Sequence, residues 1–313
     1  MAYTIISALL PMLAILVLGF LAGWHQDFDG KQAAILNRMV MLYALPLSLF
    51  AGMMATPRDE ILAQGSLALA ILLAMVVPYA IVVLIAHYLF RRGLMDASLQ
   101  ALAIAGPAVP FVGASVLGKL FGDESAIPIS VSSLVMNLIQ VPVTLMLLSA
   151  GAKQNKLPGG SAPTLTTTIV HALREPVVWA PILALVAVLF GIQPIAPVQD
   201  SLLLLGKATG GVALFASGIV LYSRSVAISL PTGISVLARN ILVPALTWAF
   251  LLLAGFDHER IREVVLTMAI PTAALCVILA VQYQTAEQEM ASTLFFSTIL
   301  SIVTMGAFIW LTA

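Results

Sequence analysis

Long apolar stretches alternate with short polar segments along the whole chain. A helix needs roughly 20 apolar residues to cross a hydrocarbon core about 30 Å thick. Ten stretches reach that length, and each is predicted to be a membrane-spanning helix. They lie near residues 4–24, 34–54, 65–90, 97–120, 125–149, 172–191, 201–222, 229–254, 261–282 and 290–312. The pattern therefore predicts an all-α integral membrane protein with ten transmembrane helices.

The longest polar segment lies at the middle of the chain. Residues 151–162 are rich in Lys, Gln, Asn, Pro and Gly, which is the composition of a linker. We therefore expect a first five-helix repeat over residues 1–150, a cytoplasmic linker over 151–171, and a second five-helix repeat over 172–313.

The two halves share motifs at a nearly constant offset. Leu-Phe-Ala at 49–51 recurs at 214–216, an offset of 165 residues (214 − 49). Pro11, Pro78 and Pro107 are matched by Pro176, Pro244 and Pro271, and Ser133 is matched by Ser297. Because each half has an odd number of spans, the second half enters the membrane in the opposite direction. Such inverted repeats are typical of secondary transporters.

Composition and charge agree with a membrane protein. Charged residues make up 9% of the chain, whereas soluble domains contain roughly 25%. The 14 basic and 14 acidic residues cancel, so no nucleic-acid partner is predicted. One cysteine and scattered histidines predict no metal site, and no motif predicts a cofactor.

Basic residues also predict how the chain lies in the membrane. Eight Lys and Arg residues fall in or beside the odd-numbered loops, and four in or beside the even-numbered loops. Cytoplasmic loops are the ones enriched in Lys and Arg. We therefore expect a multi-pass protein of the bacterial inner membrane with both termini on the periplasmic side.

The fourth and ninth spans contain helix-breaking residues near their middle. Each proline removes a backbone donor and frees the carbonyl four residues earlier. Non-helical backbone at this depth is tolerated only where protein or a water-filled cavity satisfies it. Broken helices at matching places in two inverted halves point to a substrate site, although a proline kink is the alternative. The predicted substrate-binding residues here are Gly106, Pro107, Pro110, Gly113, Pro271 and Thr272.

Four further polar residues lie deep in the predicted spans. Arg239 is the eleventh residue of the eighth span, about 15 Å along it at 1.5 Å per residue. No acidic residue lies at this depth, so we expect Arg239 to grip a substrate carboxylate with two parallel hydrogen bonds. The alternative is that it links helices through backbone carbonyls. Asn137, Gln140 and Asn240 either contact substrate or link helices, and we include Asn137 and Asn240 in the predicted site.

Several motifs together resemble the auxin efflux carrier family over the whole chain. They are Tyr-Ala-Leu-Pro-Leu at 43–47, the proline-rich stretch 105–113, Arg-Glu-Pro-Val-Val-Trp-Ala-Pro at 174–181, the stretch 211–218, and Arg239 followed by Pro244. The resemblance implies a scaffold from spans 1, 2, 6 and 7 and a transport domain from spans 3–5 and 8–10. It also implies an elevator-type transporter whose broken fourth and ninth spans cross at the substrate site. Much of the family has an asparagine before the fourth-span break, where this chain has Ala105 or Gly106.

The bacterial branch that the chain resembles is associated with carboxylates such as malonate or oxalate. We therefore expect a carrier, not an enzyme, which moves a small organic carboxylate anion across the lipid bilayer, with a malonate-like dicarboxylate as first choice. The exact carboxylate, the coupling ion, the direction of transport and the oligomeric state stay open, with a homodimer as one option.

Two other functions compete with this hypothesis. One is a sodium symporter of the bile-acid type, but sodium sites use several oxygen ligands, often with a carboxylate, which the predicted core lacks. Proton-coupled or uncoupled transport is therefore favoured. The other is an intramembrane hydrolase, because Gly113-Ala-Ser115 fits a G-x-S pattern. That chemistry needs a histidine base at the same depth, whereas His87 and His171 lie near helix ends.

Overall fold

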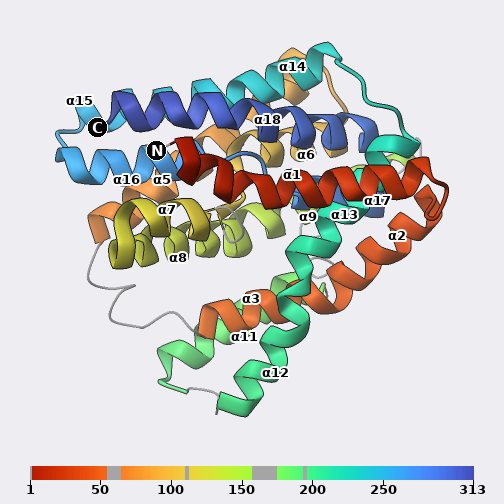
Figure 1. Ribbon diagram of the computed structural model, residues 1–313, viewed down its shortest axis with the longest axis horizontal. Helices are drawn as coiled ribbons and strands as arrows, with labels where there is room; N and C mark the ends of the chain where they lie inside the picture. Colours follow the sequence, from red (N-terminus) through yellow and green to blue (C-terminus); the bar gives the residue numbers. More distant parts are fainter. Residues whose placement is uncertain (1, 55–64, 110–112, 157–174, 193–195) are drawn as a thin grey trace.

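The computed structural model describes residues 2–54, 65–109, 113–156, 175–192 and 196–313. These residues form helices joined by short connections, and no strand occurs among them (Figure 1). Six helical stretches are long and apolar enough to cross a membrane: Gly30–Met54, Gly65–Leu89, Ile127–Ala152, Pro197–Ser223, Leu230–Leu253 and Glu287–Leu311. Large apolar side chains such as Leu204, Leu253 and Trp310 are exposed, as suits a surface that faces lipid. The all-α membrane fold is therefore confirmed.

The first half contains these elements in chain order. They are α1 (Ala2–Trp24), α2 (Gly30–Met39), the π turn η1 (Val40–Ala44), α3 (Leu45–Met54), α5 (Gly65–Leu84), the π turn η2 (Ile85–Leu89), α6 (Leu94–Ala105), α7 (Ala114–Phe121), the 3-10 turn η4 (Gly122–Ser125), α8 (Ala126–Val135), the π turn η5 (Met136–Gln140) and α9 (Val141–Lys156). Helix α9 thus extends six residues, 151–156, into the expected linker, whose remaining residues lie outside the described part.

The second half contains a similar series. It comprises α11 (Pro176–Leu189), α12 (Ala196–Gly206), α13 (Ala208–Ser223), α14 (Leu230–Leu237), the π turn η6 (Ala238–Leu242), α15 (Val243–Leu253), α16 (His258–Met268), α17 (Leu275–Tyr283) and α18 (Glu287–Leu311). Capping residues explain where several of these helices begin. Asp29, Ser229 and Asp257 cap the N-termini of α2, α14 and α16 by accepting hydrogen bonds from backbone N–H groups.

Two of the expected spans are each divided into two helices. Helix α6 ends at Ala105 and α7 begins at Ala114, so the stretch expected over 97–120 is interrupted around Pro107. Helix α16 ends at Met268 and α17 begins at Leu275, with Pro271 between them. Both interruptions fall where the prolines predict them. Pro110 lies outside the described residues.

Three π turns stand directly before prolines. Pro46, Pro142 and Pro244 each follow the last residue of η1, η5 or η6 by two positions. A proline lacks the N–H and crowds the carbonyl four residues earlier, and the wider π turn accommodates both effects. By contrast, Pro78 lies inside the continuous helix α5. The prolines of the fifth and eighth spans therefore reshape the turns that carry Asn137 and Arg239.

The helices pack in two groups. In the first, α1 packs along α13, α2 lies beside α13, and α3 lies against both α11 and α12. In the second, α6 packs against α5 and α9, while α18 packs against α14, α17 and η6. In Figure 1, α3, α11 and α12 lie together at one end of the molecule, away from α14, α15 and α16. The groups meet where α17 contacts α2, η5 contacts α11, and α18 contacts α1.

Helices α1 and α13 approach each other closely at two glycines. A Cβ added to Gly19 would lie 2.0 Å from the Phe215 carbonyl oxygen, and one added to Gly218 would lie 2.1 Å from that of Leu16. Both contacts are with backbone, which cannot move aside without separating the helices. Small residues at helix interfaces are a common means of close packing in membranes.

We therefore predict that Gly19→Ala and Gly218→Ala each destabilise the protein by about 1–3 kcal/mol, because the added methyl overpacks the α1–α13 contact. The melting temperature of the purified protein in detergent measures this. Gly211→Ala, also in α13, is the matched control, since a Cβ there meets nothing within 4 Å. Equal melting temperatures for Gly211→Ala and Gly218→Ala would contradict the prediction.

Candidate functional site

The two interrupted spans contact each other at their breaks. The Ala108 N–H donates to the Pro271 carbonyl at 2.9 Å, and the Ala273 N–H donates to the Gly106 carbonyl at 3.2 Å. These bonds form an isolated antiparallel bridge between Pro107 and Thr272. The two non-helical segments, residues 106–109 and 269–274, are termed the crossover below. One half of the chain thus supplies partners for backbone groups that the other half leaves free.

Arg239 holds the crossover from η6. Its Nε and Nη2 donate to the Ile270 carbonyl at 3.0 and 2.7 Å. Nη2 also donates to the Met268 carbonyl at 2.8 Å, and Nη1 donates to the Ile104 carbonyl at 2.9 Å. Four of the five guanidinium N–H groups are therefore used on carbonyls of both broken spans.

The charge of Arg239 has no acidic partner within the described residues. The side chain is 0% exposed, and the ion pairs of this part of the chain involve Arg92, Arg224 and Arg260 instead. Arg239 is also the only charged residue there that is fully buried. Since an arginine stays protonated in proteins, the centre of the molecule carries one positive charge that carbonyl dipoles solvate but do not neutralise.

Thr272 joins the crossover to α18, and Asn240 joins η6 to the same helix. The Asn240 Nδ2 donates to the Ser297 carbonyl at 2.8 Å, and the Ser297 Oγ donates to the Asn240 Oδ1 at 2.6 Å. The Thr272 N–H donates to the same Ser297 Oγ at 3.2 Å, and the Thr272 Oγ1 donates to the Ala103 carbonyl at 2.5 Å. The Asn240 amide is thus engaged with a neighbouring helix, and Ala103, whose carbonyl Pro107 frees, is satisfied by Thr272.

The π turn η5 supports the crossover from another side. The Gln140 Nε2 donates to the Ala105 carbonyl at 3.1 Å and to the Met75 carbonyl at 3.0 Å. Gln140 therefore holds the carbonyl next to the one that Arg239 holds. A Cβ added to Gly106 would lie 3.2 Å from the Met136 methyl, so the same turn also packs on the break.

Asn137, in the same turn, faces a cavity of about 260 Å³. Its volume lies just below the roughly 300–1,000 Å³ of pockets that hold drug-sized ligands, so it suits a smaller molecule. The cavity lies between α3, α8, α11 and α12, at the boundary between the two helix groups. None of the hydrogen bonds in the described part of the chain uses the Asn137 amide. The polar residues that line the cavity are Ser48, Ser130, Ser133 and Asn137.

The predicted residues therefore divide by location. Gly106, Pro107, Pro271 and Thr272 form the crossover itself, and Arg239 and Asn240 contact it or its helix partner. Gly113 lies beside it, since a Cβ there would be 3.1 Å from the Ile270 side chain. Asn137 lines the separate cavity described above, while Pro110 and the side chain of Ser115 lie outside what the structure describes.

Sequence reasoning missed two contributors and left a third out of the predicted site. Ser297 binds the crossover directly and Ser48 lines the cavity, whereas Gln140, left out of the predicted site, binds the Ala105 carbonyl next to the crossover. One signal pointed to Ser297, because it is matched to Ser133 of the first half, which lines the cavity. Gln140 is indistinguishable in sequence from any polar residue that links two membrane helices.

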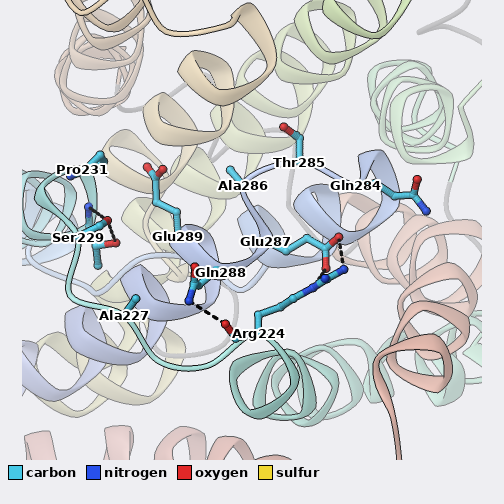
Figure 2. A pocket seen from close by; sticks show the side chains of 11 residues that line it. Arg224, Ala227, Ser229, Pro231, Gln284, Thr285, Ala286, Glu287, Gln288 and Glu289 are labelled. Carbon is cyan, nitrogen blue, oxygen red and sulfur yellow. Dashed lines mark hydrogen bonds and ion pairs between the residues drawn. The ribbon is translucent and has the colours of Figure 1, made fainter. Parts of the chain in front are cut away.

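A larger cavity, of about 590 Å³, lies away from the crossover at the ends of α13, α14, α17 and α18 (Figure 2). Its charged groups already have partners. The Arg224 guanidinium donates to the Glu287 carboxylate at 3.0 and 3.2 Å, and Glu289 pairs with Arg92. Gln288 donates to the Arg224 carbonyl at 2.7 Å. This cavity therefore offers no uncompensated charge to a substrate.

Comparison with known proteins agrees with these features. Residues 4–309 match the family described as "Membrane transport protein". The "Uncharacterized transporter YfdV" of Escherichia coli (strain K12) is 30% identical over 309 residues, which cover 97% of this chain and 96% of the relative. The "Putative malonate transporter" of Rhizobium meliloti (strain 1021) is 25% identical, with 98% of this chain and 95% of the relative covered. The family and these relatives are transporters, not enzymes. The chain therefore belongs to the membrane transport protein family, the auxin efflux carrier family that its motifs predict.

Proposed function

We propose that this protein is a secondary transporter that moves a small organic carboxylate anion across the bacterial inner membrane by alternating access. The observation that carries the proposal is the fully buried charge of Arg239, which has no acidic partner in the described part of the chain. A buried cation without a counter-ion is costly, and a bound anion removes that cost. The name of the Rhizobium meliloti relative makes malonate the first substrate to test.

Arg239 and the cavity make different contributions to binding of the anion. Because carbonyls occupy four of its N–H groups, Arg239 acts on the anion mainly through its charge. At an effective dielectric constant of about 20, a unit charge ~8 Å away still contributes on the order of 2 kcal/mol. The Asn137 amide and the hydroxyl groups of the cavity supply the directional hydrogen bonds to the carboxylate. The anion thus lies beside the crossover, between the two helix groups.

Alternating access follows from a movement of one helix group against the other. We assign α1, α2–α3, α11 and α12–α13 to the scaffold, and the remaining helices, with the crossover, to an elevator-type transport domain. Two observations support ten spans in two inverted repeats. Helix α1 packs on α13, and α11 packs on α3. In each contact, the first span of one half packs on the second span of the other half, and the two halves are related by an offset of 165 residues.

The proposal predicts malonate uptake by the purified protein in liposomes. Radiolabelled malonate should accumulate above the level of protein-free liposomes, and unlabelled oxalate should compete while a diamine of similar size should not. Imposing a proton gradient and a sodium gradient separately identifies the coupling ion, and we expect a response to protons. A correctly folded preparation that transports no small carboxylate under either gradient would rule the proposal out.

Variants of Arg239 should separate the effect of its charge on malonate binding from the effect of its hydrogen-bond geometry. Arg239→Lys keeps the charge but loses the planar set of donors, so malonate binding should weaken by about tenfold. Arg239→Gln removes the charge and should weaken binding by roughly a hundredfold or more. Equilibrium binding of labelled malonate to detergent-purified protein measures both, with size-exclusion profiles as the folding control. Wild-type affinity in a well-folded Arg239→Gln protein would show that the charge serves the crossover alone.

Replacing Asn137 should affect binding without disturbing the crossover. Asn137→Ala should raise the Kd for malonate about tenfold or more, since a hydrogen bond to a charged group contributes roughly 1.5–3 kcal/mol. Asn137→Asp should abolish binding through like-charge repulsion. Ser201→Ala, on the exposed part of α12, is the control and should leave the Kd unchanged. An unchanged Kd in Asn137→Ala would place the anion elsewhere.

A further inference from the structure

A separate cavity, of about 420 Å³, lies between α2 and the C-terminal end of α17. Asn37, Arg38 and Met41 line it from α2 and η1, Gln282 and Gln284 line it from the end of α17, and Glu175 lines it from the start of α11. None of these residues lines the Asn137 cavity. Since α2 belongs to the proposed scaffold and α17 to the proposed transport domain, this cavity also lies on the boundary between the two.

Asn37 is an unusual residue for a structural position in this helix. It is 1% exposed, and neither its Nδ2 nor its Oδ1 has a hydrogen-bond partner among the described residues. Leaving a buried polar group unsatisfied costs roughly 1–3 kcal/mol, so an apolar side chain would make the fold more stable here. An amide kept at this cost next to a cavity indicates a partner that enters the cavity.

Arg38 indicates that the partner is negatively charged. It is exposed, lines the same cavity, and takes part in none of the ion pairs of the described residues. The acidic residue of the lining, Glu175, is already engaged in an interaction. An amide N–H beside a guanidinium is a suitable pair of donors for a carboxylate. The chemistry of this cavity therefore fits an organic anion better than a cation.

The position of the cavity relates it to the Asn137 cavity. Both cavities are lined by the single helical stretch 30–54, with Asn37 before η1 and Ser48 after it. The offset of eleven residues between these two positions (48 − 37) corresponds to about 16.5 Å along a helix. Lys31 and Arg38, at the Asn37 end, are among the basic residues expected on the cytoplasmic side.

We infer that Asn37 and Arg38 form a second carboxylate-binding site, on the cytoplasmic side of the boundary between scaffold and transport domain. This inference rests on the proposed function, because its ligand is the transported anion. The Asn37 amide donates to one carboxylate oxygen and Arg38 neutralises the group. The anion occupies this site as it passes between the Asn137 cavity and the cytoplasm.

Cysteine protection tests the site without altering its binding residues. The single native cysteine, Cys276, is buried and can be replaced by alanine. Ala34 also lines the cavity and lies one turn before Asn37 and Arg38, so Ala34→Cys is the reporter. In inside-out vesicles, a membrane-impermeant thiol reagent should label position 34, and malonate should slow the labelling about fivefold or more. Lys31→Cys, which does not line the cavity, should be labelled at the same rate with and without malonate.

Asn37→Leu in the Ala34→Cys background then tests whether the protection by malonate depends on Asn37. It should abolish protection by malonate while leaving the melting temperature unchanged or higher, and it should raise the KM for malonate presented from the cytoplasmic side about threefold or more. Labelling without protection would mean that the cavity holds only water, and protection that survives Asn37→Leu would exclude Asn37. Labelling from the periplasmic side alone would overturn the location. If unmodified protein transports malonate in any of these cases, the proposed function stands and only this inference fails.

Discussion

A break in a membrane helix leaves backbone carbonyls that water cannot reach, and the centre of this protein depends on how they are satisfied. Arg239 satisfies three of them, at Ile104, Met268 and Ile270, which belong to both broken spans. A guanidinium suits this task because its N–H groups point in several fixed directions, whereas the ammonium of lysine is a compact charge. The same four bonds that hold the breaks together also fix a full positive charge at the crossover.

The surrounding helices keep this arrangement in one body. Gln140 and Thr272 satisfy the carbonyls of Ala105 and Ala103, and Ser297 accepts the N–H of Thr272. All of these residues lie in the proposed transport domain, so the crossover can move as a unit without exchanging its hydrogen bonds. The scaffold is held by different means, namely the close backbone contact at Gly19 and Gly218. The cavities lined by Asn137 and by Asn37 lie between the proposed scaffold and the proposed transport domain, which is where an alternating-access mechanism needs them.

How much of this the sequence could predict depended on the range of each effect. Proline acts on its own turn, so the helix ends around Pro107 and Pro271 could be predicted from the chain alone. The partners of the freed carbonyls could not, because Ala103 meets Thr272 and Gly106 meets Ala273 across 169 and 167 residues of sequence. Counting residues predicts a mid-membrane position for Arg239, but its carbonyl partners come from other spans and could not be predicted. Asn37 carried no signal in sequence, since only the packed structure shows that its amide is unpaired.

The π turn at Arg239 makes two related halves unequal. The matched prolines Pro11 and Pro176 are 165 residues apart, whereas Pro78 and Pro244 are 166 apart, and of the latter two helices only the second has a π turn before its proline. A π turn holds one residue more than the α-helical turn that it replaces, so the register of the second helix is kept.

The first half has only apolar residues at the corresponding positions, 73–76, and the centre therefore has one fixed charge where exact symmetry would give none or two. A dicarboxylate bound as proposed above would retain one negative charge without a partner. A proton carried together with the substrate is the simplest way to neutralise that charge inside the membrane.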